Sequence, residues 1–347
     1  MTINFFASPI GLGHATRDIA IAQTLDPGLF QFISGAGAAG LLAKKGYDTL
    51  DLYTPEKFEV ESGELQRSFR WLMGYYSYYK KCKVIAKGVL EKNDDDGLVV
   101  SDEDFASIAV AEEMRRRRVL ITDITETHFT TGAASIIEKK MNKSMKKMME
   151  ACDRVIIPDA GEDSGNVVHV GPIVRPASAD RQTLRKQFGF SGTTILVSIG
   201  GTDAGKFLVE KMIEVHRRIG PRLDSKLVIV SGPSLKLADS PDYQNAGFAE
   251  NMHEMVYGAD LVVSLAGRST MDESIAFGTP GIFIPIKGHF EQEQGAARLG
   301  FRFEDVFRLE QLIEEKLAGK KRAPVPDDAA AGARKAADII AGLSKDT

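Results

Sequence analysis

Short runs of apolar residues, rich in Val, Ile and Phe, alternate with longer segments of helical periodicity along the chain. Runs of about four to seven residues, bounded by Gly, Pro or Asp, are typical of strands that are buried on both faces. The strands predicted in this way span residues 3–7, 30–34, 98–101, 119–122, 154–157, 167–170, 194–199, 226–231, 261–265 and 281–285. Helical patterns lie between them, as at 16–25, 205–218 and 270–277. The alternation predicts parallel sheets with helices on both faces.

The order of these elements indicates two domains. The predicted strands are too many for one sheet of usual size, and residues 171–176 form a natural connector near the middle. The expected fold class is therefore α/β, with two Rossmann-like domains at residues 1–172 and 173–326 whose parallel sheets face a central cleft. The alanine-rich end, residues 327–347, predicts a final helix. Ligands of such folds bind where strands end and helices begin, so the loops after strands hold the candidate chemistry.

Composition limits the function further. The chain has 347 residues, 43% of them hydrophobic and 27% charged, and its formal net charge is −4. This balance provides no basic field, so we expect no nucleic-acid partner. Cys82 and Cys152 lie outside any metal-binding pattern, so reduced thiols in a cytoplasmic protein are expected. We expect no secretion signal and no membrane span, because no apolar run reaches about 18 residues, while contact with a membrane surface stays open.

The first glycine-rich loop, residues 8–18, follows the first predicted strand. Gly11 and Gly13 allow a tight turn and a close approach of the backbone to a ligand. His14 stands between these glycines and the next helix, where it is a candidate general base or a histidine that only caps the loop. Arg17 is placed to hold a phosphate or a carboxylate. Thr16 occupies the third glycine position of the dinucleotide motif, which argues against an NAD enzyme.

The second glycine-rich loop follows the strand predicted at 194–199. Gly200, Gly201 and Thr202 open a helix, so backbone N–H groups and the Thr202 hydroxyl suit a diphosphate. Phe207 stands where a P-loop carries the hydroxyl that binds Mg²⁺, which argues against an NTPase. The alternative is an ordinary capped helix start.

The third loop, residues 264–286, again opens a helix after a strand. Gly267, Arg268, Ser269 and Thr270 form the helix start, and Glu273 falls on the first turn. A carboxylate at this position accepts hydrogen bonds from a ribose diol, or it serves only the helix dipole.

These motifs, in this order, resemble the MurG-like glycosyltransferases of GT-B fold. The resemblance covers the chain from Gly11 to Ala296 and includes Gly267-x-x-Thr-x-x-Glu, Gly278-Thr-Pro280 and Glu291-Gln292. The Gly-x-Gly-His-x-x-Arg loop is similar to that of an archaeal MurG-like group, and also to the nucleotide-sugar hydrolase of pseudaminic acid synthesis. In GT-B proteins the last helix commonly returns to the N-terminal domain.

The resemblance implies a site for a UDP-sugar and a metal-free reaction without a cofactor. Glu273 would hold the ribose, Phe248 would pack over uracil, and Glu291 and Gln292 would contact sugar hydroxyls, with His14 as the base. The candidate donor-binding residues are Gly13, Arg17, Arg175, Gly200, Gly201, Thr202, Phe248, Ala249, Gly267, Arg268, Ser269, Thr270, Glu273, Glu291 and Gln292. The favoured function is a glycosyltransferase. A UDP-sugar hydrolase that uses water, and a nucleotide-sugar-binding protein without catalysis, remain alternatives.

The acceptor side is less defined. Asp102, Glu126 and His128 follow predicted strands of the first domain and are candidates for binding the acceptor or for structural hydrogen bonds. The aromatic segment 69–81 fits either a lipid interface or a helix core. The basic runs 115–118 and 139–147 fit either anionic lipid or a solvated helix face. A lipid-linked acceptor and peripheral contact with the inner membrane face therefore remain open.

Overall fold

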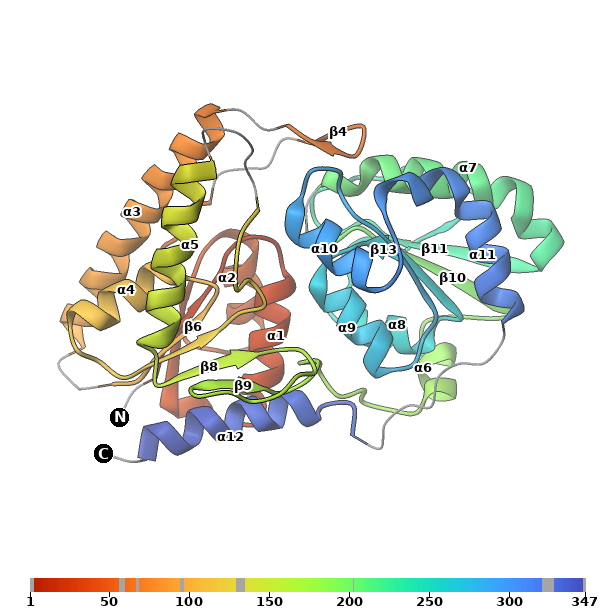
Figure 1. The fold of residues 1–347 in the computed structure, drawn as a ribbon. Helices are drawn as coiled ribbons and strands as arrows, with labels where there is room; N and C mark the ends of the chain where they lie inside the picture. The colour runs from red at the N-terminus through yellow and green to blue at the C-terminus, as the bar shows by residue number, and fades with distance from the viewer. Residues whose placement is uncertain are drawn as a thin grey trace. The chain divides into compact units, whose positions relative to one another are not determined.

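A computed structural model describes residues 3–55, 60–66, 69–93, 97–128, 135–201, 203–319 and 328–345. The chain divides into two compact units. The first unit comprises Met1–Lys57, Arg67–Ile173 and Ala330–Thr347, and the second comprises Phe58–Gln66 and Val174–Ala329. Figure 1 shows that each unit is a sheet flanked by helices.

The first unit contains a seven-stranded sheet in the order β3-β2-β1-β6-β7-β8-β9, with every neighbouring pair parallel. The strands are β1 (Ile3–Ala7), β2 (Phe30–Ser34), β3 (Thr49–Asp51), β6 (Val99–Asp102), β7 (Arg118–Ile121), β8 (Arg154–Ile157) and β9 (Val167–His169). The helices are α1 (Gly13–Ala22), α2 (Ala36–Lys44), α3 (Phe69–Lys92), α4 (Phe105–Glu113), α5 (Ser135–Glu150) and α12 (Ala331–Lys345), with a 3₁₀ turn at Pro27–Leu29.

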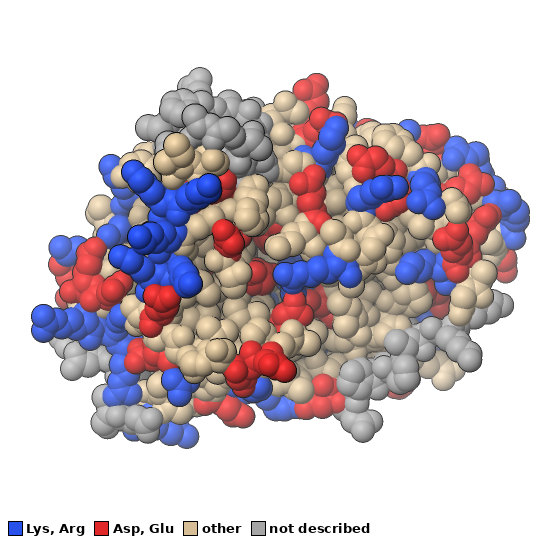
Figure 2. Space-filling model, viewed as in Figure 1, with Lys and Arg blue, Asp and Glu red and all other residues tan. Residues whose placement is uncertain are grey.

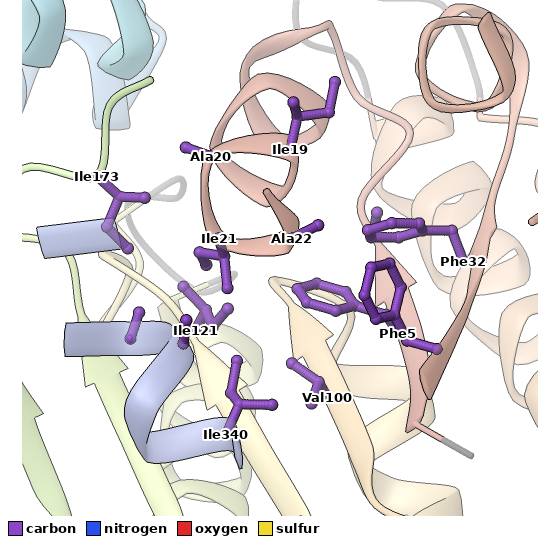
Figure 3. Packing of buried hydrophobic residues seen from close by; sticks show 14 of the residues in the cluster. Phe5, Ile19, Ala20, Ile21, Ala22, Phe32, Val100, Ile121, Ile173 and Ile340 are labelled. Atoms are coloured by element: carbon purple, nitrogen blue, oxygen red, sulfur yellow. The ribbon is translucent and has the colours of Figure 1, made fainter. Parts of the chain in front are cut away.

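Apolar side chains of this sheet fill a core on each face because successive strand residues point to opposite sides. Phe5 and Phe32 pack with α1, α2 and α12 on one face, and their rings lie 4.9 Å apart. Phe6 and Ile33 pack with α3 and α4 on the other face. In Figure 3 Ile340 of α12 lies in the same cluster as Ile121, so the final helix belongs to the core of the first unit.

The second unit contains a five-stranded parallel sheet in the order β12-β11-β10-β13-β14. Its strands are β10 (Thr193–Ser198), β11 (Ser225–Val230), β12 (Gln244–Asn245), β13 (Leu261–Leu265) and β14 (Gly281–Ile284). Its helices are α6 (Arg181–Gln187), α7 (Lys206–Leu223), α8 (Met252–Gly258), α9 (Arg268–Ala276), α10 (Phe290–Arg298) and α11 (Leu309–Ala318), with 3₁₀ turns at Asp203–Gly205 and Phe303–Arg308. Ile195 and Leu196 enter opposite cores, as in the first unit.

A hairpin of β4 (Val60–Glu61) and β5 (Glu64–Leu65) belongs to the second unit, although its residues fall within the range 1–172 expected for the first domain. Leu65 N donates to Lys287 O and Lys287 N donates to Gly63 O, both at 2.9 Å. Lys287 Nζ also lies 2.6 Å from Glu64 Oε1. These contacts attach the hairpin to the segment that follows β14.

Both sheets have a point where the strand order reverses along the chain. In the first unit it lies between β1 and β6, and in the second between β10 and β13. The loops after these neighbouring strands lead to helices on opposite faces, which leaves room for a ligand at the carboxyl edge. The loops after β1, β10 and β13 are the three glycine-rich loops of the sequence.

Candidate functional site

His14 lies at the reversal point of the first sheet. It enters α1 directly after the turn that Gly11 forms with a φ of +76°, in the left-handed region that favours glycine. Asp102 ends β6 and is in register with Ala7 of β1, so it lies beside the same loop. His14 Nδ1 is 3.2 Å from Asp102 Oδ1. The fold thus joins two residues that are 88 positions apart.

Arg17 lies one helical turn after His14 and binds the same carboxylate. Its Nε donates to Asp102 Oδ2 at 2.9 Å, and its Nη2 donates to Asp102 Oδ1. Arg17 Nη2 is also 3.2 Å from His14 Nδ1. Since Asp102 is fully buried and Arg17 is 5% exposed, this is a desolvated bidentate ion pair.

The charges of this cluster favour an ionised Asp102. Burial by itself would raise the pKa of Asp102, but the charges of Arg17 and His14 and their hydrogen bonds hold it well below its usual range. Burial lowers the pKa of Arg17, while the charge and hydrogen bonds of Asp102 raise it above its ordinary value. Asp18, also fully buried, has a raised pKa because of burial and the neighbouring Asp102 charge. Asp102 is therefore the fixed negative charge of the cluster.

Glu103 follows Asp102 and completes the cluster. Its Oε2 is 3.6 Å from His14 Nε2 and its Oε1 is 3.9 Å from Arg17 Nη2. Glu103 was not among the candidate site residues predicted from the sequence. Its position in the loop after β6 could have pointed to Glu103, because the reversal of strand order places this loop beside the one that carries His14.

The sequence leaves two roles open for each of Arg17 and Asp102. Arg17 is placed there to hold a phosphate or a carboxylate, and Asp102 to bind the acceptor or to form structural hydrogen bonds. In the structure both side chains are buried and bind each other, and Asp102 lies on the Nδ1 side of the histidine. Their hydrogen bonds are those of residues that orient His14, and the predicted ligand contacts stay predictions.

Gly200 and Gly201 follow β10 at the reversal point of the second sheet. Gly200 has a φ of +77°, and a Cβ atom on the neighbouring Gly232 would lie 2.3 Å from Gly200 O. Ser234 Oγ donates to Gly201 O at 3.0 Å. These contacts fix the loop with its backbone close to that of the loop after β11. Thr202 lies outside the described residues.

Glu273 lies on α9, which Gly267 precedes as the N-terminal capping residue. The side chain is buried, with 5% exposure, and its Oε2 accepts no hydrogen bond within the described part of the chain. Burial raises the pKa of Glu273 to about 8, against a lowering effect of the Arg175 charge and a further raising effect of Asp272. Within the part of the chain that the structure describes, Glu273 is thus a buried carboxyl with no hydrogen-bond donor at one of its two oxygens.

Arg175 and Arg268, two of the candidate donor-binding residues, have protein partners. Arg175 is 4% exposed and its Nη2 donates to Glu250 O at 2.9 Å. Arg268 Nε donates to Asp272 Oδ2 at 2.9 Å, one turn along α9. Ser269 and Thr270 are half-buried at the start of the same helix. Both arginines therefore contribute positive charge near Glu273 and α9, and the hydrogen bonds described here are donated to other residues of the protein.

The remaining donor candidates occupy loops of the second unit. Phe248 is 42% exposed, and Ala249 packs against the core of the second unit. Gln292 Oε1 accepts from Ile286 N at 3.0 Å, which ties α10 to the end of β14. Glu291 is half-buried in the first turn of α10.

The three acceptor candidates lie in different environments. Glu126 and His128 are exposed on the segment after β7, and no described contact joins them to Asp102. In the aromatic segment, Tyr78 and Tyr79 pack against the core, and Lys80 Nζ lies 4.5 Å from the ring centroid of the exposed Tyr76. The side chains of 69–73 and Tyr75 lie outside the described part.

The two basic runs have different environments. Arg116 donates to the Leu90 and Asn93 carbonyls, each at 2.7 Å, so part of the run 115–118 serves the fold. By contrast, five lysines of α5 are exposed, and Figure 2 shows basic side chains gathered over this helix. They are Lys139, Lys140, Lys143, Lys146 and Lys147.

Metal-ligating geometry is not found: within the ranges the structure describes, no three His, Cys, Asp or Glu side chains are grouped to hold a metal ion. Cys82 and Cys152 are free and buried, and burial raises the pKa of each thiol to about 12.

The sequence shows clear relatives. Residues 194–338 match the glycosyltransferase family 28 C-terminal domain. An uncharacterized glycosyltransferase of Methanopyrus kandleri is 26% identical over 266 residues, which cover 71% of this chain and 75% of the relative. A protein of Methylobacterium nodulans, named UDP-N-acetylglucosamine--N-acetylmuramyl-(pentapeptide) pyrophosphoryl-undecaprenol N-acetylglucosamine transferase, is 31% identical over 192 residues, covering 50% of this chain and 51% of the relative.

Solved structures resemble the whole chain. The calicheamicin glycosyltransferase CalG4 has a TM-score of 0.65 at 14% identity, covering 100% of this chain and 99% of its own. MurG of Acinetobacter baumannii has a TM-score of 0.57 at 13% identity, with the same coverage. The UDP-GlcNAc 2-epimerase of Methanocaldococcus jannaschii, solved with UDP-GlcNAc and UDP, has a TM-score of 0.57 at 11% identity, covering 99% and 100%.

At these identities the structural likeness concerns the fold, and it confirms the predicted class: the protein is an α/β protein of GT-B fold with Rossmann-like units. The epimerase shows that this fold alone does not fix the reaction. The match to the family 28 domain and the glycosyltransferase relatives identify the enzyme class. The chain is a glycosyltransferase of GT-B fold that resembles MurG.

Proposed function

We propose that this enzyme transfers a sugar from a UDP-sugar to a hydroxyl acceptor, with His14 as general base and without a metal ion or cofactor. The observation that carries the proposal is the hydrogen bond between His14 Nδ1 and the buried Asp102. An ionised carboxylate at Nδ1 favours the tautomer that carries its proton there, which leaves the lone pair of Nε2 to accept a proton.

The proposed reaction begins when Nε2 removes the proton of the acceptor hydroxyl. The acceptor oxygen attacks the anomeric carbon, and the electron pair of the broken sugar–phosphate bond stays with UDP. Negative charge then grows on the diphosphate. The backbone N–H groups near Gly200 and Gly201 and at the start of α9 are suited to stabilise it, since helix N-termini bind anions.

The proposed donor specificity rests on the second unit. UDP-N-acetylglucosamine appears in the name of the Methylobacterium relative, and UDP-GlcNAc and UDP are bound in the epimerase of similar fold. In this chain a ribose diol would supply the donors that Glu273 Oε2 lacks among the described residues. The exposed ring of Phe248 would pack on the base. Glu291 and Gln292 would contact the sugar.

The proposed acceptor is lipid-linked, as the undecaprenol in the Methylobacterium enzyme's name suggests for that protein. The exposed lysines of α5 support contact with an anionic membrane surface at its inner face, at about 1 kcal/mol for each lysine near the surface. None of the helices in the described ranges is long and apolar enough to cross a membrane. We therefore propose peripheral attachment.

A UDP-release assay with His14→Gln tests this function. UDP, UDP-GlcNAc, UDP-glucose, GDP-mannose and ADP are first compared by thermal shift, and the stabilising UDP-sugar becomes the donor. Loss of a general base lowers turnover by about 10²- to 10⁴-fold, while the shift caused by UDP stays unchanged. His169→Gln, which alters a histidine in β9, is the control.

The outcomes separate the alternatives. UDP release that needs an acceptor supports a transferase, and equal release in its absence supports a UDP-sugar hydrolase. Binding of UDP without turnover, unchanged in His14→Gln, would identify a nucleotide-sugar-binding protein and refute the catalytic role of His14.

A further inference from the structure

The β4–β5 hairpin has a tight turn of defined geometry. Glu61 pairs with Glu64, so the loop between the two strands consists of Ser62 and Gly63. These two residues have φ angles of +49° and +80°. Positive φ at both central residues is the type I′ turn, whose twist matches that of the flanking strands. A two-stranded hairpin is only marginally stable alone in water, so contacts with the rest of the second unit hold it in place.

A cluster of three phenylalanines packs against this turn. Phe207 of α7 stacks on Phe303 with ring centroids 6.3 Å apart, and Phe307 meets Phe303 edge to face at 6.2 Å. Gly63 is buried against the cluster, because a Cβ atom there would lie 2.8 Å from Phe303 Cε2 and 3.0 Å from Phe207 Cδ1. Both its φ and the space around it therefore require glycine at this position.

The hairpin pairs through its backbone with Lys287, the middle residue of the segment between β14 and α10. Lys287 N donates to Gly63 O and Leu65 N donates to Lys287 O, as in a parallel bridge between Glu64 and Lys287. The Glu64 and Lys287 side chains also form an ion pair, but each is 48% exposed, so this contact adds little. The two backbone hydrogen bonds are therefore the main attachment of the hairpin to this segment.

The residues on either side of Lys287 are bonded to α10. Ile286 N donates to Gln292 Oε1 at 3.0 Å, and Gly288 N donates to Glu293 Oε1 at 2.8 Å. Both acceptors belong to the start of α10, which begins at residue 290. The hairpin, the segment 286–289 and the start of α10 thus form one continuous hydrogen-bonded network. A displacement of the hairpin is therefore expected to move the Gln292 side chain.

The bond to Ile286 also determines which end of the Gln292 amide is left for a ligand. A backbone N–H only donates, so the side-chain oxygen must face it, and the Nε2 group keeps its two hydrogens. Nε2 donates no hydrogen bond to any residue that the structure describes. Gln292 therefore offers hydrogen-bond donors, and its partner on a sugar is an oxygen, either of a hydroxyl or of an acetamido group.

We propose that the β4–β5 hairpin is a positioning element for the donor sugar: its pairing with Lys287 sets the place of the Gln292 amide that donates to a sugar oxygen. This inference rests on the proposed function, in which Gln292 contacts the sugar. The ribose and base contacts proposed for Glu273 and Phe248 lie on other elements, α9 and the loop before α8. The hairpin should therefore affect the sugar and not the uridine part, which makes binding of UDP the internal reference for binding of the UDP-sugar.

The first test needs no ligand and follows amide hydrogen exchange of residues 286–289. Gly63→Ala forces the turn away from the phenylalanine cluster, and Leu65→Pro removes an N–H that pairs with Lys287. Each variant should speed exchange in this segment about 10-fold or more. Gly46→Ala is the matched control, since Gly46 has a φ of +88° and open space around its Cβ, and it should leave this exchange unchanged. Unchanged exchange in both hairpin variants would overturn the proposal.

The second test measures by calorimetry the affinities for UDP and for the UDP-sugar, UDP-GlcNAc or UDP-glucose, that stabilises the protein more in the thermal-shift comparison. Gly63→Ala should weaken binding of the UDP-sugar about 3- to 10-fold, the effect of one neutral hydrogen bond, and change UDP affinity by less than about twofold. Gln292→Met, which loses the amide donor, should show the same pattern. Combining the two substitutions should weaken the UDP-sugar no further than Gln292→Met alone, because both act on one contact.

Each outcome decides a separate question. An unchanged affinity for the UDP-sugar in Gly63→Ala would overturn the proposal. So would an equal fall in both affinities, because the hairpin would then only support the fold of the second unit. Additive losses in the combined variant would show that the hairpin acts by a route other than Gln292, and would also refute the proposal. If the wild type binds neither UDP nor a UDP-sugar, the proposed function fails and this inference with it, while hydrogen exchange still shows whether the hairpin orders residues 286–289.

Discussion

Glu273 should make the stability of the enzyme depend on pH, and Glu273→Gln should remove that dependence. The carboxyl is 5% exposed, and burial raises its pKa from 4.5 to about 8. Glutamine has nearly the same size and hydrogen-bonding shape as the protonated acid, but it does not ionise. The substitution therefore isolates the cost of charging this one group.

The direction in which stability changes with pH follows from where Glu273 binds its proton. Between pH 4.5 and about 8 the folded protein keeps a proton on Glu273 that the unfolded chain has lost. Stability therefore falls as pH rises through this window, and below it the contribution is fully present. At 1.36 kcal/mol per pKa unit the whole effect is at most about 5 kcal/mol, and the part lost between pH 6 and 9 is roughly 2 to 3 kcal/mol.

Urea unfolding followed by circular dichroism, at pH 6 and pH 9, measures this difference. We expect the wild type to lose roughly 2 to 3 kcal/mol more than Glu273→Gln between the two conditions. Glu315→Gln, an exposed carboxylate of α11, should follow the wild type. If the wild type and Glu273→Gln lose the same free energy of unfolding, Glu273 does not hold its proton, and the argument from burial is refuted.

Two further substitutions test the loops at the reversal points. Gly232→Ala places a Cβ at a φ of +69° and 2.3 Å from Gly200 O. The affinity for UDP, measured by calorimetry, should therefore fall about 10-fold or more. Gly40→Ala is the control and should bind UDP normally, because the space around its Cβ is open. Arg17→Met leaves the Asp102 carboxylate buried without its guanidinium, so urea unfolding should show a loss of about 3 to 5 kcal/mol. A loss below about 1 kcal/mol would mean that Arg17 does not hold that charge.

Most of the sheet framework was predictable from the sequence, because its strands are continuous apolar runs. The runs at 3–7, 30–34, 154–157 and 261–265 have the same bounds as β1, β2, β8 and β13. Strands β3 and β12 were not predicted, because they have only three and two residues and carry polar side chains at the sheet edges. The hairpin of β4 and β5 was missed for the same reason, since two-residue strands have no measurable periodicity.

The candidate site was predictable only where the chemistry is local. Glycine and helix-start motifs predict the three loops, because the geometry of a turn depends on residues that are neighbours in the sequence. The pairing of His14 with Asp102 spans 88 residues and depends on β6 lying beside β1, which no local pattern specifies. One signal was available: an acidic residue that ends a buried strand at a reversal point is costly unless it has a fixed partner.

Asp102 and Glu273 show that equal burial produces opposite charge states. Both carboxyls are at most 5% exposed and each follows a reversal point of its own sheet. Asp102 accepts two hydrogen bonds from Arg17 and lies 3.2 Å from His14 Nδ1, and the charge of Arg17 lowers its pKa. Glu273 has the charge of Arg175 nearby but no donor at Oε2 within the described residues, so its pKa is raised.

The consequence is a difference in how the two groups meet a ligand. The Asp102 cluster is complete in the free protein, because its donors are side chains, and it needs no ligand to orient His14. If a ribose diol binds Glu273 as proposed, the diol supplies the missing donors and favours the ionised form. Binding would then release a proton at neutral pH, so donor affinity would rise with pH up to about 8, the pKa of the free carboxyl.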